Sequence, residues 1–355
     1  YGLQWGHACL AGIDAAVYPL PMSTPETAPR AALRLHWTRT ALGDPHVQLQ
    51  RASTDAGFRS YWRTEGVTPS RVVMDAPPDK EDLRPWLRVR DLLDATGVRV
   101  PQVLARDEVQ GFLILEDLGG PTVAQVITDA NADGLIDAAI TQLIRLQSLA
   151  LPSDFPVFGE ALLQRDAGLF EEWFIGKHLG IHLDCADSEC LQLAQRRLMD
   201  NALAQARVPT HRDYMLRNLM PVDTGPAVLD FQDMVHGPIA YDPVSLLRDA
   251  FSSWPEPRVE GWLQHYHARA MQAGLPVPGL AKFIRDADWC GVQRHLKILG
   301  IFARLQHRDG KPRYLADAPR FFTYLDAVVP KYRALDPLQE LLERTLKPAF
   351  AKVCA

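Results

Sequence analysis

The sequence lacks most of the features that mark secreted, membrane-spanning or nucleic-acid-binding proteins. Its 355 residues include five cysteines, an odd number scattered along the chain, which is typical of reduced thiols rather than of a disulfide framework. No apolar run approaches the roughly 20 residues that span a bilayer. The formal net charge of -5 argues against nucleic acid as the main partner. We therefore expect a cytoplasmic protein that acts without membrane, nucleic acid or an obligate protein partner.

The sequence also lacks internal repeats, and its composition is that of a soluble globular protein. Hydrophobic residues make up 47% and charged residues 23%, and the length fits one large two-lobed unit or two ordinary domains. The first 21 residues have neither the basic start nor the apolar segment of a signal peptide. Because Met22 resembles a natural start, we expect residues 1–21 to be an upstream extension or a cloning remnant.

The following hundred residues predict strands mixed with helices. Apolar spacing predicts a helix over 30–42, and a small polar turn at 53–57 predicts a hairpin within 48–63. A second helix is expected to be capped by Asp79 and ended by Gly97. Three further segments predict strands: 71–75, a stretch after Pro101, and 111–115.

From Ile136 onward the pattern is mainly helical, except around 208–231, and 280–308 predicts one long helix. The layout predicts an α+β fold with an antiparallel sheet and a helix in its amino-terminal part. We expect two lobes, a smaller one over 22–118 and a larger helical one over 119–355.

The most informative stretch is His211-Arg212-Asp213-Tyr214-Met215-Leu216-Arg217-Asn218. Its pattern, H-R-D-x-x-x-x-N, is that of the kinase catalytic loop. Two short apolar segments follow, around a turn at 223–226, and predict a hairpin that places Asn218 opposite Asp230 or Phe231. Carboxylate and amide oxygens side by side are ligands that magnesium accepts.

These residues define roles in phosphoryl transfer. Asp213 is predicted to orient the attacking hydroxyl, and Asn218 and Asp230 to hold magnesium against the phosphates of ATP. Each of the three has an ordinary structural interpretation as a turn or capping residue, but their shared register favours catalysis. His211 is expected to brace the loop. The pattern therefore predicts a two-lobed protein-kinase-like fold, with the smaller lobe binding ATP.

Together with Leu229-Asp230-Phe231-Gln232, the loop resembles that of the aminoglycoside phosphotransferase-type kinases, a superfamily that also covers choline and fructosamine kinases. Protein kinases are less similar, because Gln232 stands where they have glycine. The sequence also has no Ala-Pro-Glu and no Val-Ala-Ile-Lys segment.

Within this superfamily, the chain is similar to the cell-wall sugar kinases that phosphorylate the anomeric hydroxyl of N-acetylmuramate and N-acetylglucosamine. Four segments carry this resemblance: 52–59, 73–78, 229–233 and 293–300. The resemblance implies ATP and magnesium as cofactors. It also implies a sugar 1-phosphate as product, which feeds the recycling of peptidoglycan sugars.

The resemblance further implies where ATP binds. The adenine edge is expected at the carbonyl of Glu116 and the amide of Leu118, in the link between the lobes. The place of the phosphate-covering loop is taken by Ser53, Thr54, Asp55 and Gly57. The third strand has no lysine for the α- and β-phosphates. Three nearby residues are candidates for that role: Arg59, Arg63 and Lys80.

Four basic residues of the long helix fall on one stripe: Arg294, Lys297, Arg304 and Arg308. The stripe is either a solvated basic face or part of the sugar site. In the second interpretation, Arg294 or Lys297 binds the lactyl carboxylate of N-acetylmuramate. Arg217 and Asp233 are two further substrate-binding candidates.

Asp242 has two interpretations, as a catalytic carboxylate or as the N-cap of a helix with Pro243 in its first turn, and the cap is favoured. Two alternatives to a sugar kinase stay open. One is another small-molecule kinase, for an aminoglycoside or an amino alcohol. The other is a non-catalytic nucleotide-binding regulator, which the missing third-strand lysine would suit.

Overall fold

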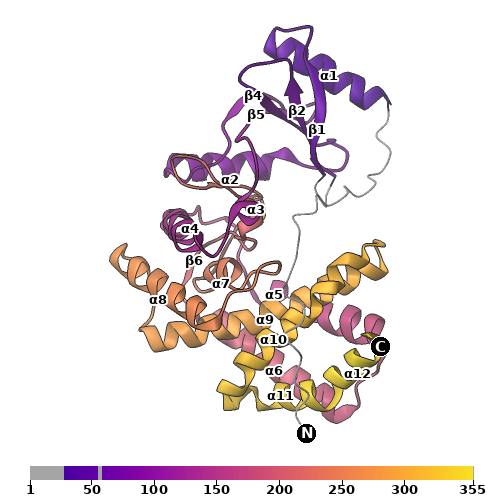
Figure 1. Cartoon of the computed structure of the whole chain (residues 1–355), viewed down its shortest axis with the longest axis vertical. Helices are drawn as coiled ribbons and strands as arrows, with labels where there is room; N and C mark the ends of the chain where they lie inside the picture. Colours follow the sequence, from indigo (N-terminus) through magenta and orange to yellow (C-terminus); the bar gives the residue numbers. More distant parts are fainter. Residues whose placement is uncertain (1–27, 55–57, 355) are drawn as a thin grey trace. The chain divides into compact units, whose positions relative to one another are not determined.

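The computed structural model describes residues 28–54 and 58–354, and the chain divides into two compact units (Figure 1). The first unit runs up to Arg88 and includes Val100–Pro121, and the second comprises Val89–Arg99 and everything from Thr122 onward. The segment after Pro121 therefore belongs with the helical unit, and so does the end of the helix that crosses Arg88. Residues 1–21, expected to be an extension, lie outside the described residues.

The first unit contains a five-stranded antiparallel sheet in the order β1-β2-β3-β5-β4. Its strands are β1 (Gln48–Thr54), β2 (Ser60–Glu65), β3 (Arg71–Asp75), β4 (Val103–Asp107) and β5 (Phe112–Glu116). The predicted hairpin, third strand and later strand pair are confirmed. Helix α1 (Ala28–Leu42) is also confirmed.

Helix α1 covers one face of this sheet. The register pairs Trp62 with Val73 and Asp75 with Phe112, which places these side chains on a common face. Arg30 stacks over Phe112 at 4.1 Å, and Arg34 stacks over Trp62 at 3.7 Å. Both arginines also donate to the carboxylate of Asp75. The face is therefore closed by two stacked guanidinium groups that share the carboxylate of Asp75.

Helix α2 (Leu83–Ala95) begins later than the sequence predicted. The expected cap at Asp79 is wrong, because Asp79 lies in a turn four residues before the helix. Asp82 takes the capping position, and its Oδ1 accepts the backbone N–H of Arg84 at 2.9 Å. Gly97 follows the helix end with φ of 77°, as a left-handed terminator.

The second unit is mainly helical. Its α-helices are α3 (Val123–Val126), α4 (Ala132–Gln147), α5 (Glu160–Leu169), α6 (Cys185–Ala204), α7 (Tyr241–Leu247), α8 (Glu256–Gln272), α9 (Leu280–His307), α10 (Ala318–Val328), α11 (Asp336–Leu341) and α12 (Lys347–Cys354). Wider π-helical turns are η1 (Phe170–His178) and η6 (Leu342–Leu346). Short 3-10 segments are η2 (Leu216–Asn218), η3 (Pro312–Asp317), η4 (Val329–Lys331) and η5 (Arg333–Leu335).

Two small antiparallel strand pairs interrupt the helices. Strand β6 (Arg207–Thr210) pairs with β9 (Val235–Pro238), and β7 (Leu219–Met220) pairs with β8 (Ala227–Val228). The predicted exception to the helical pattern is thereby confirmed.

Helix α9 is the central element of this core. It runs unbroken from Leu280 to His307, and most of its residues between Asp286 and Ala303 are buried. Gly300 lies against the end of α5, where a Cβ atom would come within 2.4 Å of the backbone carbonyl of Leu169. The absence of a side chain at Gly300 therefore allows the two backbones to approach.

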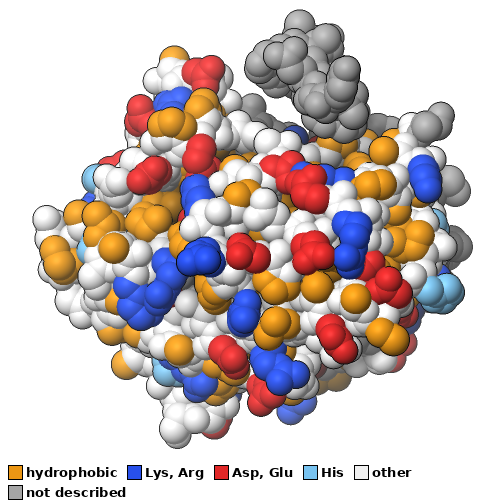
Figure 2. Space-filling model, turned by 90° about the horizontal axis from the view of Figure 1, so that it is seen from below, with side chains coloured by type: hydrophobic (Ala, Val, Ile, Leu, Met, Phe, Trp, Pro, Cys, Tyr) orange, Lys and Arg blue, Asp and Glu red, His pale blue; other side chains and the backbone are white. Residues whose placement is uncertain are grey.

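On the face drawn in Figure 2, acidic and basic side chains are interspersed rather than gathered by sign. Among the described residues, no helix combines the length and the apolar character that a membrane crossing requires. The cysteines within the described part of the chain, Cys185, Cys190, Cys290 and Cys354, are free thiols.

Candidate active site

The loop after β6 is held by a buried carboxylate. Asp242, which is 0% exposed, accepts the backbone N–H of His211 at 2.6 Å and that of Arg212 at 2.9 Å. Arg212 has φ of 76°, a left-handed conformation that is costly for a non-glycine residue. The carbonyl of Arg212 accepts Nη1 of Arg294 at 2.9 Å. The strained residue is therefore fixed at both its amide and its carbonyl.

The predicted N-cap role of Asp242 is wrong. The residue that caps α7 is Ala240, and Asp242 lies within the first turn of the helix together with Pro243. Its carboxylate bonds the loop that begins 31 residues earlier at His211. Sequence spacing identifies a helix start here but gives no sign of this long-range partner.

Asp213 follows directly and presents its side chain to solvent, with 44% of that side chain exposed. Its Oδ1 lies 3.6 Å from Nη1 of Arg294. Burial raises the pKa of Asp213, but the positive charges of Arg294 and Lys297 outweigh that effect and hold the pKa below its usual value. The carboxylate is therefore ionised at neutral pH.

His211 braces the loop from within. The buried ring donates from Nε2 to the carbonyl of Leu229 at 2.9 Å, and its Nδ1 accepts the backbone N–H of Asp213 at 3.3 Å. This pair of bonds requires the neutral Nε2–H tautomer. His211 thus links the loop that carries Asp213 to the segment that carries Asp230.

Asn218 and Asp230 lie side by side at the open end of the β7–β8 hairpin. Leu219 pairs with Val228, so Asn218 stands opposite Leu229, one residue short of the predicted partners. The amide Nδ2 of Asn218 still lies 3.5 Å from Oδ2 of Asp230 and donates to the carbonyl of Asp213 at 2.9 Å. Asp230 is the second non-glycine residue with positive φ, at 61°.

This arrangement fits a magnesium ion. The NH2 group of Asn218 donates to the carbonyl of Asp213 and lies beside the Asp230 carboxylate. The Oδ1 atom of Asn218 can therefore act as an acceptor for a metal ion. Magnesium usually binds through one or two protein oxygens and completes its shell with phosphate and water. Asn218 Oδ1 and the Asp230 carboxylate supply such a pair.

Asp249 is a buried carboxylate that the sequence did not single out. Its two oxygens accept the backbone N–H groups of Leu216, at 3.3 Å, and Phe251, at 2.6 Å. Exposed Arg217 lies over the ring of Phe251 at 4.7 Å. The turn that carries Asn218 is therefore supported from the segment after α7. A buried Asp within an apolar stretch was the signal available for both Asp242 and Asp249.

Two cations of α9 are buried below the loop. Arg294 is 2% and Lys297 is 7% exposed, which excludes a solvated basic face for these two positions. The ammonium of Lys297 lies 2.9 Å from Oδ2 of Asp166, which is 1% exposed, and donates to the hydroxyl of Tyr241 at 3.4 Å. Arg308, from the same predicted stripe, is exposed and pairs with Asp309.

Among the other candidates, Asp233 is exposed and its carbonyl accepts Arg212 at 3.5 Å. In the first unit, Ser53 and Thr54 end β1 and pair with Tyr61 and Ser60. Asp55 and Gly57 lie outside the described residues.

The three basic candidates for the lysine role each have a neighbour. Arg59 lies 3.8 Å from Glu81, Arg63 forms a bidentate pair with Asp117, and Lys80 lies 5.4 Å from the ring centre of Phe58.

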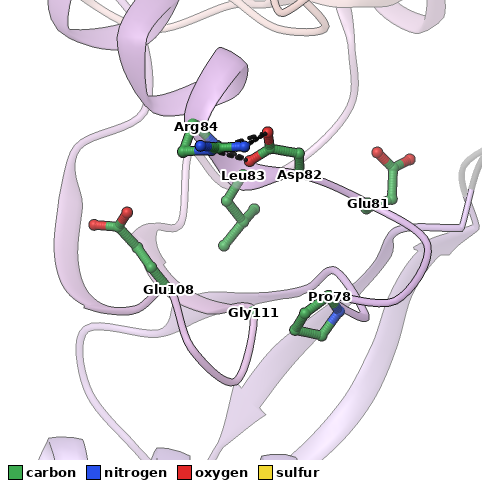
Figure 3. Close-up of a pocket in the computed structure, with 7 residues that line it drawn as sticks. All are labelled: Pro78, Glu81, Asp82, Leu83, Arg84, Glu108 and Gly111. Atoms are coloured by element: carbon green, nitrogen blue, oxygen red, sulfur yellow. Dashed lines mark hydrogen bonds and ion pairs between the residues drawn. The ribbon is translucent and has the colours of Figure 1, made fainter.

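A separate pocket of about 260 Å³ lies in the first unit (Figure 3). Its lining consists of Pro78, Glu81, Asp82, Leu83, Arg84, Glu108 and Gly111. Asp82 and Arg84 face each other in it as an ion pair at 2.7 Å. None of the described residues that were predicted to bind nucleotide or metal lines this pocket, so it is distinct from the site around Asp213.

The chain belongs to the phosphotransferase enzyme family known as APH, whose model matches residues 48–277. It is an ATP-dependent phosphotransferase with an α+β protein-kinase-like fold, as the sequence predicted.

More particular relatives are enzymes named N-acetylmuramate/N-acetylglucosamine kinase. The one from Pseudomonas putida is 48% identical over 299 residues, covering 84% of this chain and 88% of the relative. The one from Pseudomonas aeruginosa is 49% identical over 302 residues with the same coverage. The one from Neisseria meningitidis is 42% identical over 313 residues, covering 86% of this chain and 93% of the relative.

Solved structures show the same fold at low identity. An ADP-bound aminoglycoside phosphotransferase matches with a TM-score of 0.57 and 15% identity, over 82% of this chain and 97% of that one. Ethanolamine kinase from Plasmodium vivax matches with a TM-score of 0.60 and 12% identity, over 89% and 93%.

Proposed function

We propose that this protein transfers the γ-phosphoryl group of ATP to the anomeric hydroxyl of N-acetylmuramate and N-acetylglucosamine. The product would be a sugar 1-phosphate for the recycling of peptidoglycan sugars in the cytoplasm. The names of its relatives support the two sugars. The observation that carries the chemistry is the half-exposed carboxylate of Asp213 above two buried cations.

Asp213 orients the acceptor. Its ionised carboxylate accepts a hydrogen bond from the sugar hydroxyl and aligns the oxygen for in-line attack on the γ-phosphorus. As the new P–O bond forms and the bond to ADP breaks, the hydroxyl proton passes to Asp213 or leaves with the product. The lowered pKa of Asp213 makes orientation its main contribution.

Asn218 and Asp230 hold magnesium, which when bound neutralises the charge of the phosphates. In the first unit, the carbonyl of Glu116 and the amide of Leu118 bond the adenine edge. The backbone and hydroxyl groups of the phosphate-covering segment, Ser53, Thr54, Asp55 and Gly57, cradle the phosphates.

Two cations lie close to Asp213, and each already faces an acid. Nη1 of Arg294 lies 3.6 Å from Asp213 itself, and the ammonium of Lys297 lies 2.9 Å from Asp166. We propose that Arg294 or Lys297 favours the carboxylate of N-acetylmuramate. Arg217 and Asp233, at the rim, are proposed to contact the sugar.

An ADP-release assay with magnesium and ATP tests this function on N-acetylmuramate, N-acetylglucosamine, kanamycin and choline. We expect turnover of the two amino sugars, a phosphorus NMR signal of a sugar 1-phosphate, and loss of turnover in Asp213→Ala. Turnover of kanamycin or choline instead would move the substrate to another class within the family. ATP binding without turnover of any acceptor would favour a regulator.

A further inference from the structure

The segment after β5 is tied down by one carboxylate. Asp117 lies between Glu116 and Leu118, and 5% of its side chain is exposed. Its two oxygens accept four hydrogen bonds, two from Arg63 at 2.7 and 3.0 Å, one from the Ser70 hydroxyl at 2.6 Å, and one from the Gly119 amide at 3.0 Å. The peptide groups on both sides of Asp117 are therefore held in place.

Arg63 reaches this segment across the sheet. It pairs with Val72 of β3, and Val72 pairs with Leu115 of β5, so the three residues form one row. From that row the guanidinium also donates to the carbonyl of Gly119 at 2.9 Å. A planar fork that bonds a carboxylate twice and a neighbouring carbonyl once fixes direction as well as position.

We propose that Arg63 and Asp117 are positioning residues that set the preference for ATP over GTP. The inference rests on the proposed contacts of the Glu116 carbonyl and the Leu118 amide with adenine. Adenine offers an amino donor beside a ring acceptor, whereas guanine offers an oxygen beside an N–H. A rigid carbonyl–amide pair bonds both groups of adenine, whereas with guanine it sets an acceptor against an acceptor and a donor against a donor. A carbonyl–amide pair that can rotate distinguishes the two bases less well.

The bidentate pair is also the reason that Arg63 does not stand in for the third-strand lysine. Three of its five N–H donors, on Nε and Nη2, are engaged by Asp117 and by the Gly119 carbonyl. Its contribution is to the base of the nucleotide and not to its phosphates.

The test compares Arg63→Ala and Arg63→Lys with the wild type. Calorimetry without sugar gives the Kd for ATP and for GTP, each with magnesium. We expect the ratio of the two Kd values to fall by about tenfold or more in Arg63→Ala, since mismatched polar groups carry such discrimination. Arg63→Lys keeps the charge without the fork, so its ratio should lie between the two.

Arg84→Ala is the matched control, because Arg84 forms another bidentate pair with an aspartate, Asp82, in the same unit. Its ratio should equal that of the wild type, and the KM for sugar should change less than about twofold in all three variants. An unchanged ratio in Arg63→Ala and Arg63→Lys, or a wild type that binds ATP and GTP alike, overturns the inference. Because sugar is absent from the calorimetry, failure of the proposed acceptor specificity does not affect this result.

Discussion

The carboxylate of Asp242 accepts the backbone N–H groups of His211 and Arg212 together, and so places Asp213 one residue further on. A loop residue with φ of 76° costs about 1–3 kcal/mol and persists when its surroundings hold it. One buried carboxylate thus maintains the geometry of the loop that carries Asp213, the residue proposed to orient the acceptor.

The first prediction concerns pH. Burial raises the pKa of Asp242 to about 6, although the hydrogen bonds from the amides of His211 and Arg212 and the charge of Arg294 oppose the rise. Protonation turns one acceptor oxygen into an O–H that faces a backbone N–H. We therefore expect kcat to fall below about pH 6, while Asp213, with its lowered pKa, stays ionised. A profile of kcat between pH 4.5 and 8 measures this decrease, which is the acidic limb of the profile.

In Asp242→Asn the limb near pH 6 should disappear and kcat should fall by about a hundredfold, the effect of a small misplacement of the catalytic group. A variant that keeps the wild-type limb would assign it to another group. The effect of Asp242 on stability has the opposite pH dependence to its effect on kcat. The folded state binds this proton more tightly than the unfolded chain, so the contribution of Asp242 to the unfolding free energy falls as pH rises from about 4 to about 6.

The second prediction concerns the metal ligands. Asn218→Ala and Asp230→Ala should each lower kcat by at least about a hundredfold and raise the magnesium concentration that gives half of the maximal rate. Magnesium titrations at saturating ATP measure both quantities. Asp223→Ala, in the exposed turn of the same hairpin, is the control and should behave as wild type. Equal magnesium requirements in all variants would remove Asn218 and Asp230 from the metal site.

The third prediction separates two roles of the buried cations. In Arg294→Ala or Lys297→Ala, the ratio of kcat/KM for N-acetylmuramate to that for N-acetylglucosamine should fall by about tenfold, as expected for loss of a charge-assisted bond. Arg308→Ala, an exposed residue of the same predicted stripe, should leave the ratio unchanged. If kcat/KM falls equally for the two sugars, Arg294 acts through the carbonyl of Arg212 and Lys297 acts through Asp166. Neither side chain then distinguishes the two acceptors.

The fourth prediction compares two helical glycines. A Cβ at Gly300 would lie 2.4 Å from the backbone of Leu169, whereas a Cβ at Gly261 would have no neighbour within 4 Å. Gly300→Ala should therefore destabilise the protein by about 1–3 kcal/mol or more. Gly261→Ala, in the middle of α8, should stabilise it by about 0.4–1 kcal/mol. Chemical denaturation of the two variants side by side measures the difference, and equal stabilities would contradict the close approach.

Local patterns predicted what depends on neighbours in the chain. Alternation and turn residues were enough to locate the strands of the sheet, and the spacing between Asp213 and Asn218 was enough to predict that the two residues share one loop. The register of the β7–β8 hairpin was predicted one residue out, because the turn absorbs more residues than its sequence indicates.

Long-range partners were not predictable in the same way. A helical stripe fixes the direction in which Arg294 and Lys297 project, but not what packs over them, and burial beside Asp166 and Tyr241 depends on α5 and α7. The pattern around Asp242 correctly predicted the start of a helix. It gave no information about the loop at His211 and Arg212 that the Asp242 carboxylate bonds.

The widened turn η1, which continues α5 beside Gly300, has a consequence for how this chain can change length. A π-helix bonds each residue to the fifth one along and so holds more residues per turn than an α-helix. Loss of one residue within Phe170–His178 would let the segment continue as an ordinary helix. Because the wide turn already holds the extra residue, its loss would leave the helix on either side with nearly the same orientation about its axis. The same loss within α5 would instead turn everything beyond it by about 100°. The stretch Phe170–His178 is therefore where this helix can lose a residue while its aromatic side chains stay directed toward α9.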